Sequence, residues 1–398
     1  MRKIFYICFA VLLGGCASTM QSHLNDIQHD FANSEFKSVS DSKPSEQNNL
    51  DLLINGNALF LDGQYNQSDE IFEEFNKRGL HETSTSITRE TAGLLFGQSV
   101  NSYKPYMMDS LFVSYYQIWD LLAMNDWANA RVVINQSYER QKNMSIEYKK
   151  LIEQNKEKIQ SNSQIKDFIN KNKSDWVAFR DIMNPALMYL SGIYFLNDGD
   201  FDNAITYLKR ANGMMPDNQY IIRDLQLAQQ RIKPKNVTWT FFESGFAPRL
   251  TEKDAGLFLP KIGMIYFVFS DAYLNNQYTK PENGQILADV DAMFMTEYNE
   301  YQTNEILRSI TSGVSKTALQ TTMYNSGSDA STIMGIISSV YTVTSSHADV
   351  RTWATLPKYI YAIRTENKTN ENNLVYIREI DGKIISNKTI NLTKGATK

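Results

Sequence analysis

The sequence has almost no cysteine, and its two cysteines, Cys8 and Cys16, both lie within the first sixteen residues. The rest of the chain can therefore form no disulfide, no thiolate metal site and no cysteine nucleophile. A chain of this composition folds in an oxidising compartment without mispaired disulfides. Thiol redox chemistry and cysteine-bound zinc are thus excluded for the main body of the protein.

Histidines and catalytic motifs are also scarce. The four histidines, at positions 23, 29, 81 and 347, are spread along the chain, so we do not expect them to share a metal ion. The sequence holds no Gly-rich phosphate loop and no H-E-x-x-H, C-x-x-C or G-x-S-x-G motif. It therefore predicts no cofactor, no metal and no enzymatic activity, although a hydrolase built on paired carboxylates would leave no local signature.

A basic block is missing as well. The chain has 40 Lys and Arg against 44 Asp and Glu, a net charge of −4 that becomes −6 if Arg2 and Lys3 are removed. A mildly acidic chain without a basic run argues against nucleic acid as a partner.

The chain begins with MRKIFYICFAVLLGGC, which has the layout of an export signal. Two cations precede an apolar run from Ile4 to Leu13, and small residues follow it. About ten apolar residues are too few to cross the roughly 30 Å of bilayer hydrocarbon. Residues 1–15 are therefore predicted to be a signal peptide that is removed.

The last residues of this signal, Leu13-Gly14-Gly15-Cys16, resemble the lipobox of bacterial lipoproteins. The resemblance implies a diacylglycerol on the Cys16 sulfur, cleavage before Cys16 and an acyl chain such as palmitate on the new amine. Two or more fatty chains anchor a protein stably in a membrane. Ala17, in place of the aspartate of an inner-membrane retention signal, favours the periplasmic side of the outer membrane. The alternative is an ordinary exported protein with a chance cysteine.

The mature chain is predicted to be an α+β multidomain protein with two folded domains. Residues 16–50 are rich in Ser, Asn, Asp and Gln, with a weak apolar pattern through Leu24, Ile27, Phe31 and Phe36, and are expected to be a flexible tether behind the lipidated cysteine. Residues 51–235 follow a helical period. Within them, the sparsely apolar stretch 146–173 is interpreted as a solvated helical arm, and Ser84–Tyr103 as a further helix.

One local pattern appears three times in this helical part: GQYNQS at Gly63–Ser68, NDWANA at Asn125–Ala130 and GDFDNA at Gly199–Ala204. Each resembles the turn of a tetratricopeptide repeat, a pair of helices in which small residues allow a close approach. The copies lie 62 and 74 residues apart, so additional helices must separate them. The positions that match the repeat are Gly192, Phe195, Ala204, Ala211 and Pro216 in the third copy; Gly56, Leu59, Ser68, Phe72 and Phe75 in the first; and Ile118, Leu121, Ala130 and Ile134 in the second.

Residues 236–398 are predicted to form an α+β domain built on an antiparallel sheet or sandwich. NVTWTFFESG, KIGMIYFVFS and LPKYIYAIRTE have the composition of strands, and a helix is expected from Ile286 to Tyr324. An apolar stretch, Thr332–Val343, follows that helix. The last strands, NLVYIREIDGKIISNKTINL, are predicted to form a hairpin with a type I′ turn at Asp381-Gly382.

Candidate binding residues come from two stretches of this domain. In residues 347–364, Asp349, Arg351 and Trp353 alternate along an expected strand, so Arg351 would bind a carboxylate or phosphate and Trp353 would stack on a ligand. The preferred alternative is an Asp–Arg pair with Trp353 covering the edge of the sheet. In the compact turn FESGFAPR, Glu243 and Arg249 are further candidates.

An acidic D-x-D pair, Asp289 and Asp291, could in principle hold a metal ion. The pair falls in the expected helix, where residues two apart point to opposite sides. A solvated helix face is the predicted structure.

Three motifs together resemble an uncharacterised family of tetratricopeptide-containing bacterial lipoproteins. They are the stretch Asn129-Ala130-Arg131-Val132, E-x-G-x-A-P-[KR] at Glu243–Arg249 and A-D-x-R-[ST]-W-x-[ST]-L-P at Ala348–Pro357. Members are often encoded near lipoproteins that activate penicillin-binding proteins, which implies work in the cell envelope. The sequence thus predicts a non-enzymatic adaptor for envelope proteins, whose repeats offer a concave groove and whose C-terminal domain makes a second contact. The alternative is binding of peptidoglycan or a small ligand by that domain.

Lipidation can be tested by metabolic labelling with a palmitate analogue. Cys16→Ser should abolish both the label and the membrane fractionation, because the thiol that accepts the lipid is gone. Cys8→Ser, in the apolar run of the signal, is the matched control and should keep both. A Cys16→Ser protein that is still labelled and still membrane-bound would contradict the prediction.

Overall fold

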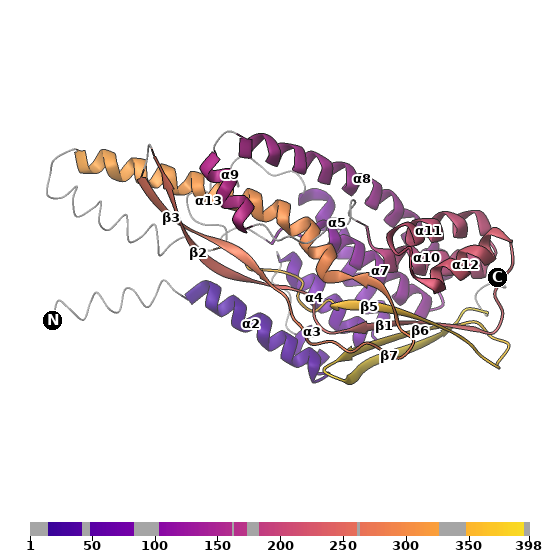
Figure 1. Ribbon diagram of the computed structural model, residues 1–398. Helices are drawn as coiled ribbons and strands as arrows, with labels where there is room; N and C mark the ends of the chain where they lie inside the picture. The colour runs from indigo at the N-terminus through magenta and orange to yellow at the C-terminus, as the bar shows by residue number, and fades with distance from the viewer. Residues whose placement is uncertain are drawn as a thin grey trace.

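The computed structural model describes residues 15–41, 48–82, 103–160, 163–172, 183–260, 263–325 and 348–393. Within these ranges, helices dominate up to residue 229, and strands with one long helix follow (Figure 1). Residues 1–14 of the expected signal, nearly all of the expected helix Ser84–Tyr103 and the apolar stretch Thr332–Val343 lie outside the described residues.

The described helices and strands have the following bounds. The helices are α2 (Gly15–Ala32), α3 (Phe36–Ser40), α4 (Asn49–Leu61), α5 (Tyr65–Glu82), α7 (Met107–Ala123), α8 (Trp127–Gln160), α9 (Ser163–Asn172), α10 (Pro185–Asp198), α11 (Phe201–Met214), α12 (Gln219–Gln229) and α13 (Val290–Asn325). The strands are β1 (Val237–Ser244), β2 (Arg249–Leu259), β3 (Gly263–Tyr273), β4 (Gln285–Asp289), β5 (Tyr359–Glu366), β6 (Asn373–Ile380) and β7 (Lys383–Asn391).

Helix hairpins occur at all three of the predicted turns, as the pairs α4–α5, α7–α8 and α10–α11. Small residues allow the close approach: a Cβ on Gly56 would lie 2.6 Å from the ring of Phe72, and one on Gly192 would lie 2.6 Å from the side chain of Leu208. Ser68 links two hairpins, because its hydroxyl donates to Asp120 Oδ2 at 2.8 Å. The helix pairs are thus confirmed, and their relation to tetratricopeptide repeats stays a prediction.

The third hairpin shows how local sequence sets the ends of the helices. Asn184 caps α10 by accepting hydrogen bonds from two backbone N–H groups, and Pro185 occupies the first turn, where no N–H is needed. Gly199 ends the helix with a φ of +88°, which favours glycine. The Asp200 side chain then caps α11.

The main sheet has the strand order β4-β5-β1-β6-β7. The predicted strands β1, β3, β5, β6 and β7 are all present, but β1 pairs parallel with β6, so the expectation of a purely antiparallel sheet is wrong. The helix expected from Ile286 begins only at Val290, because residues 285–289 form β4 at the edge of the sheet. The turn at Asp381-Gly382 is confirmed as a two-residue hairpin in which both residues have positive φ, as type I′ requires.

The inner face of this sheet packs directly on the helices, as Figure 1 shows. Every second residue of β1, including Trp239 and Phe241, points toward the helical layer, and Phe241 contacts Trp119 of α7 at 5.5 Å between ring centroids. Tyr376 of β6 contacts Phe60 of α4 at 4.8 Å. One continuous hydrophobic core therefore runs through both predicted domains.

This packing fills the groove that the sequence predicted for a partner. Residues 111–122 of α7 and 185–197 of α10 are all buried, together with almost all of α4. The inner helices of the three hairpins are therefore covered by the chain's own sheet. The expectation of an open concave groove on this side is wrong for the described structure.

An extension beyond the main core is built from the distal half of α8, α9, α13 and the two-stranded hairpin β2–β3. A second, smaller hydrophobic cluster joins Ile169 of α9, Phe267 and Phe269 of β3 and Ile306 of α13. The stretch 146–173 is helical as expected. It is not simply solvated, because Asn155 donates to the Glu300 carboxylate at 2.8 Å and Ile169 is buried.

The N-terminal segment is folded against the body. Leu24, Ile27 and Phe31 of α2 and Phe36 of α3 are buried, and these are the four residues of the weak apolar pattern in the sequence. Gln28 donates a hydrogen bond to the backbone oxygen of Ala354 at 2.7 Å, in a segment more than 300 residues away. The prediction of a flexible tether is therefore wrong for residues 15–41.

The close helix contact in the third hairpin can be tested with alanine substitutions. Gly192→Ala should lower the free energy of unfolding by about 1–3 kcal/mol, because the new Cβ would overlap the buried Leu208 side chain. Gly213→Ala in α11, where nothing lies within 4 Å, should instead raise it by up to about 1 kcal/mol through helix propensity. Urea denaturation measures both, and equal stabilities would contradict the packing described.

Candidate functional site

The two stretches that supplied the candidate binding residues lie side by side. The Ala247 N–H donates to the Leu356 oxygen at 2.8 Å, and the Lys358 N–H donates to the Ser244 oxygen at 2.9 Å. The Thr352 hydroxyl donates to the Pro248 oxygen at 3.1 Å. Hydrogen bonds therefore hold residues 244–248 and 352–358 next to each other at the end of β1.

Trp353 lies inside the hydrophobic core. Its side chain is 2 % exposed and packs against Phe72 and Tyr116, with ring centroids 6.1 Å away in each case. A buried indole ring between these helices cannot stack on a ligand in solution. Its assignment as a ligand-stacking residue is wrong, and Trp353 instead joins the segment 348–358 to the helices.

Asp349 and Arg351 form an ion pair with two parallel hydrogen bonds. Arg351 Nε donates to Asp349 Oδ1 at 2.7 Å and Nη2 donates to Oδ2 at 2.6 Å. The guanidinium, 11 % exposed, also lies over the ring of Tyr103 at 6.0 Å. The Asp–Arg pair of the preferred alternative is confirmed, although residues 348–353 form no strand.

Glu243 is a buried member of an interior pair. Its Oε2 accepts hydrogen bonds from the hydroxyls of Tyr376 at 2.7 Å and Tyr116 at 3.1 Å, and it lies 4.0 Å from Arg378 Nε. Burial raises the pKa of Glu243, and the positive charge of Arg378 opposes that rise. Glu243 therefore fastens β1 to α7 and β6 from within and does not face a ligand.

Arg249, at the start of β2, is a candidate that is partly exposed. Its guanidinium donates to the side-chain oxygen of Asn25 in α2 and lies over the ring of Tyr273 at 5.5 Å. These contacts join the N-terminal helix to the base of the β2–β3 hairpin. The structure thus gives Arg249 a positioning contact that the sequence did not reveal.

The D-x-D pair is not on a solvated helix face, so that prediction is wrong. Asp289 ends β4 and caps α13 by accepting from the Ala292 N–H at 3.0 Å. Asp291 is buried and pairs with the ammonium group of Lys358. Burial raises the pKa of Asp291 to about 6, against the lowering effect of Lys358.

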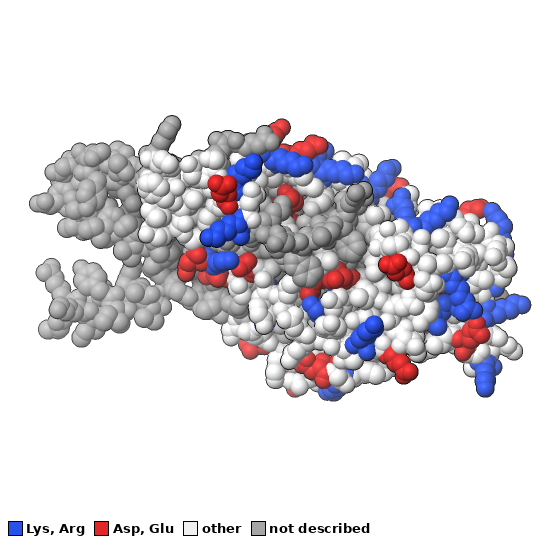
Figure 2. Space-filling view, in the orientation of Figure 1, with Lys and Arg blue, Asp and Glu red and all other residues white. Residues whose placement is uncertain are grey.

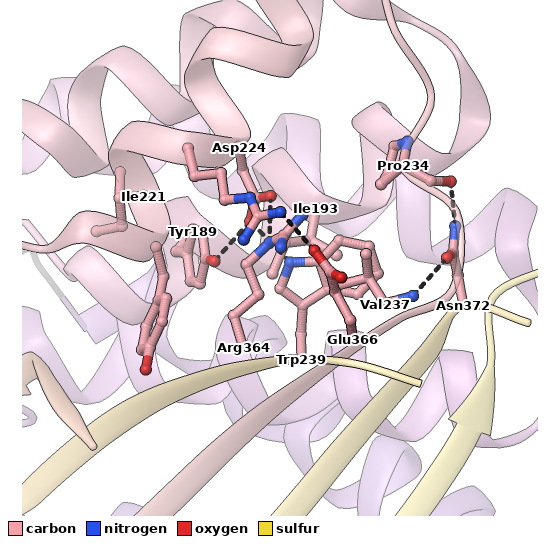
Figure 3. A network of polar contacts seen from close by, with 12 residues as sticks. Tyr189, Ile193, Ile221, Asp224, Pro234, Val237, Trp239, Arg364, Glu366 and Asn372 are labelled. Carbon is pink, nitrogen blue, oxygen red and sulfur yellow. Dashed lines mark hydrogen bonds and ion pairs between the residues drawn. The ribbon is translucent and has the colours of Figure 1, made fainter. Parts of the chain in front are cut away.

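A polar network that sequence reasoning missed lies between α10, α12 and the sheet (Figure 3). Buried Asp224 accepts hydrogen bonds from Tyr189 and Trp239 at 2.7 Å each and from Arg364 Nε at 2.8 Å. In the sequence, only the arginine within the apolar strand YIYAIRTE hints at this network. A buried arginine needs an acidic partner, but the sequence does not show which residue that partner is.

A second group of buried carboxyl side chains that the sequence did not indicate lies at the N-terminus of α7. Glu297 of α13 accepts hydrogen bonds from the backbone N–H groups of Met107 at 2.5 Å and Met108 at 3.0 Å. Asp109 accepts from the Tyr103 hydroxyl at 2.7 Å. Burial raises the pKa of Glu297 to about 8 and that of Asp109 to about 7. These carboxyl groups tie α13 and residue 103 to the start of α7.

The described ranges hold neither a cluster of metal ligands nor a membrane-spanning helix. There, no three His, Cys, Asp or Glu side chains gather closely enough to hold a metal ion. No helix in this part of the chain is both long and apolar enough to cross a bilayer. One open hollow of about 690 Å³ lies between α3, the end of α4 and the start of α5.

Compared with models of known protein families, with curated proteins and with solved structures, the chain gives no match. The functional interpretation therefore depends on the residues and contacts described above.

The raised pKa of Glu297 predicts a measurable pH dependence of stability. The folded protein keeps a proton on Glu297 up to about pH 8, whereas an unfolded glutamate, with a pKa of 4.5, releases it near that pH. The free energy of unfolding should therefore fall as pH rises from about 5 to 8.

Glu297→Gln should reduce this slope by up to about 1.4 kcal/mol per pH unit, the value for one proton. Urea unfolding at several pH values measures it. Glu157→Gln, at an exposed position of α8, controls for the loss of a carboxylate. An unchanged slope in Glu297→Gln would show that the group is already ionised at low pH.

Proposed function

We propose that the protein is a lipoprotein of the bacterial outer membrane, held by a lipid on Cys16 and facing the periplasm, that acts as a scaffold for other envelope proteins. The export signal and the resemblance to a lipobox support the anchor. The three helix hairpins support a scaffold, since helix pairs of this kind present extended surfaces to partners.

One observation carries the proposal: the sheet occupies the inner side of the hairpins and leaves the outer helices α5, α8 and α11 facing solvent. In α11, for example, Ala204, Leu208 and Ala211 are buried, while Asp202 and Lys209 are exposed. A partner protein would therefore bind the outer side of the helical layer. This revises the groove that the repeats alone would suggest.

One hollow lies beside the first hairpin, between α3, the end of α4 and the start of α5. Its lining mixes two apolar side chains with one cation, one hydroxyl, three carboxylates and two amides: Lys37, Ser40, Asp41, Leu59, Asp62, Gln64, Gln67, Glu70 and Ile71. Such a lining suits a polar peptide segment, which needs hydrogen bonds as well as a small apolar contact. We assign the first partner contact to this hollow.

Binding of peptidoglycan or a small ligand by the C-terminal half has less support. Trp353 is in the core, and Glu243 is in an interior pair with Arg378. Two guanidinium nitrogens of Arg351, Nε and Nη2, donate hydrogen bonds to the Asp349 carboxylate. The residues that suggested this alternative thus serve packing contacts.

Site-specific photocrosslinking in cells tests the scaffold. A photoreactive phenylalanine derivative in place of Gln67, inside the hollow, should give a discrete crosslinked envelope protein. The matched control is the same group in place of Lys209, an exposed residue of α11 outside the hollow. Combining the probe at position 67 with Glu70→Arg should weaken the crosslink severalfold, because it reverses a charge of the lining.

Identical products from positions 67 and 209, or crosslinks to bulk lipoproteins alone, would argue against a specific partner at the hollow. Repeating the experiment with Cys16→Ser separates anchoring from binding, since the partner contact and the lipid are at different places on the chain.

A further inference from the structure

The β2–β3 hairpin reaches well beyond the five-stranded sheet (Figure 1). Its strands pair from Arg249↔Tyr273 at the base to Leu259↔Gly263 at the far end. Ten residue steps in a strand cover about 34 Å. We call the far end, Gly256–Leu259 with Gly263–Tyr266, the hairpin tip.

The two faces of the hairpin differ in what they contact. On one face, Leu259, Ile265 and Phe267 are buried in the cluster with α9 and α13. On the other face of the tip, three large apolar side chains are exposed: Phe258 by 58 %, Met264 by 49 % and Tyr266 by 58 %. A strand of a folded domain usually turns polar side chains toward water, so this face is unusual.

The register gathers these three side chains into one patch. Phe258 lies directly opposite Met264, and Tyr266 lies opposite Gly256, where a Cβ would meet its ring at 3.4 Å. Cross-strand partners on one face have Cβ atoms about 5 Å apart. Residues 255–259 of β2 and 263–270 of β3 include no charged residue, and Lys261 stands in the sequence between the two strands.

On the face that carries the patch, the exposed residue Asp254 is the first charged residue toward the base of the hairpin, and Lys253 and Asp271 form an ion pair at 3.0 Å on the other face. In Figure 2, the described surface over the end of the hairpin is mostly white, with blue and red atoms closer to the middle of the molecule. Charged residues therefore bound the apolar tip on the side of the hairpin base.

The N-terminal helix points toward the same end of the molecule. In Figure 1, the first turn of α2 and the hairpin tip both lie at the left. α2 is fixed in that direction by the Asn25–Arg249 contact at the hairpin base and by Gln28 on Ala354. Cys16 is nine residues before Asn25 in this helix, a distance of about 14 Å.

We infer that the hairpin tip is a second membrane contact, in which Phe258, Met264 and Tyr266 enter the interfacial layer of the lipid surface that carries Cys16. The inference rests on the lipid anchor of the proposed function. Aromatic side chains with a polar end favour this layer, and a small apolar patch suffices there because the anchor already holds the protein at the surface.

A lipid surface suits the tip better than a second copy of the chain. Three side chains provide far less than the roughly 800 Å² per partner of a stable protein interface. A lipid interface has no minimum area of this kind, since each apolar group that enters it contributes separately. The tip also lies at the end of the body where the anchor would place the bilayer.

A fluorescent probe at the tip tests the contact in the lipidated full-length protein. Tyr266→Cys introduces the only free thiol of the mature chain, which is labelled with an environment-sensitive nitrobenzoxadiazole group. The protein is reconstituted in vesicles of phosphatidylethanolamine and phosphatidylglycerol. We expect a blue-shifted emission and strong quenching by doxyl-labelled lipids. The matched control is Ile232→Cys, at a residue 48 % exposed that follows α12, the helix at the right in Figure 1, and it should show neither effect.

The outcomes separate this inference from the anchor. If the protein does not partition into vesicles at all, the anchor of the proposed function is wrong. If it is membrane-bound but the probe at position 266 behaves like the probe at position 232, the tip contact is wrong. The inference would also be overturned if unlabelled Tyr266→Cys formed disulfide-linked dimers and the labelled protein showed no quenching by lipid. That result would favour contact between copies of the chain.

A second measurement avoids the probe. The triple variant Phe258→Ser, Met264→Ser and Tyr266→Ser should transfer between vesicles about tenfold faster than the wild type, which corresponds to about 1.4 kcal/mol of lost membrane binding. All three positions are exposed, so an unchanged melting curve confirms the fold. Transfer at the wild-type rate would contradict the inference.

Discussion

The contact between the five-stranded sheet and the inner helices of the three hairpins holds the molecule together. Trp119 of α7 lies between Phe241 of β1 and Tyr376 of β6, and burying each such side chain contributes about 1.5–3 kcal/mol. Two buried ion pairs, Asp224–Arg364 and Glu243–Arg378, cross or border the same contact. Asp224–Arg364 joins α12 to β5, and since an unpaired buried charge is costly, a shift of α12 along the sheet would be destabilising.

Local signals made much of this fold predictable. The helix hairpins follow from small residues at fixed spacing, such as Gly56 and Gly192, and from caps such as Asn184. The turn at Asp381-Gly382 follows from two residues that tolerate positive φ. Each of these features is decided within a few residues of itself, so a single sequence contains the information.

The rest depends on partners distant in the chain. The parallel pairing of β1 with β6 joins Thr238 to Asn373, and no local pattern indicates it. The sparse apolar residues of α2 look too few for folding, yet the body supplies the other half of their contacts. The prediction of binding residues was wrong for the same reason. The sequence shows the charge of Glu243 and the indole of Trp353, but the residues that bury these side chains are distant in the chain.

The packing of α2 also has a mechanical consequence. A lipid on Cys16 would be joined to the body through a short rigid helix, so the body would rotate and translate with the membrane surface and would not explore the space above it. Under the proposed outer-membrane placement, its reach into the periplasm would equal its own dimensions. Any partner fixed deeper in the envelope would have to come to the protein.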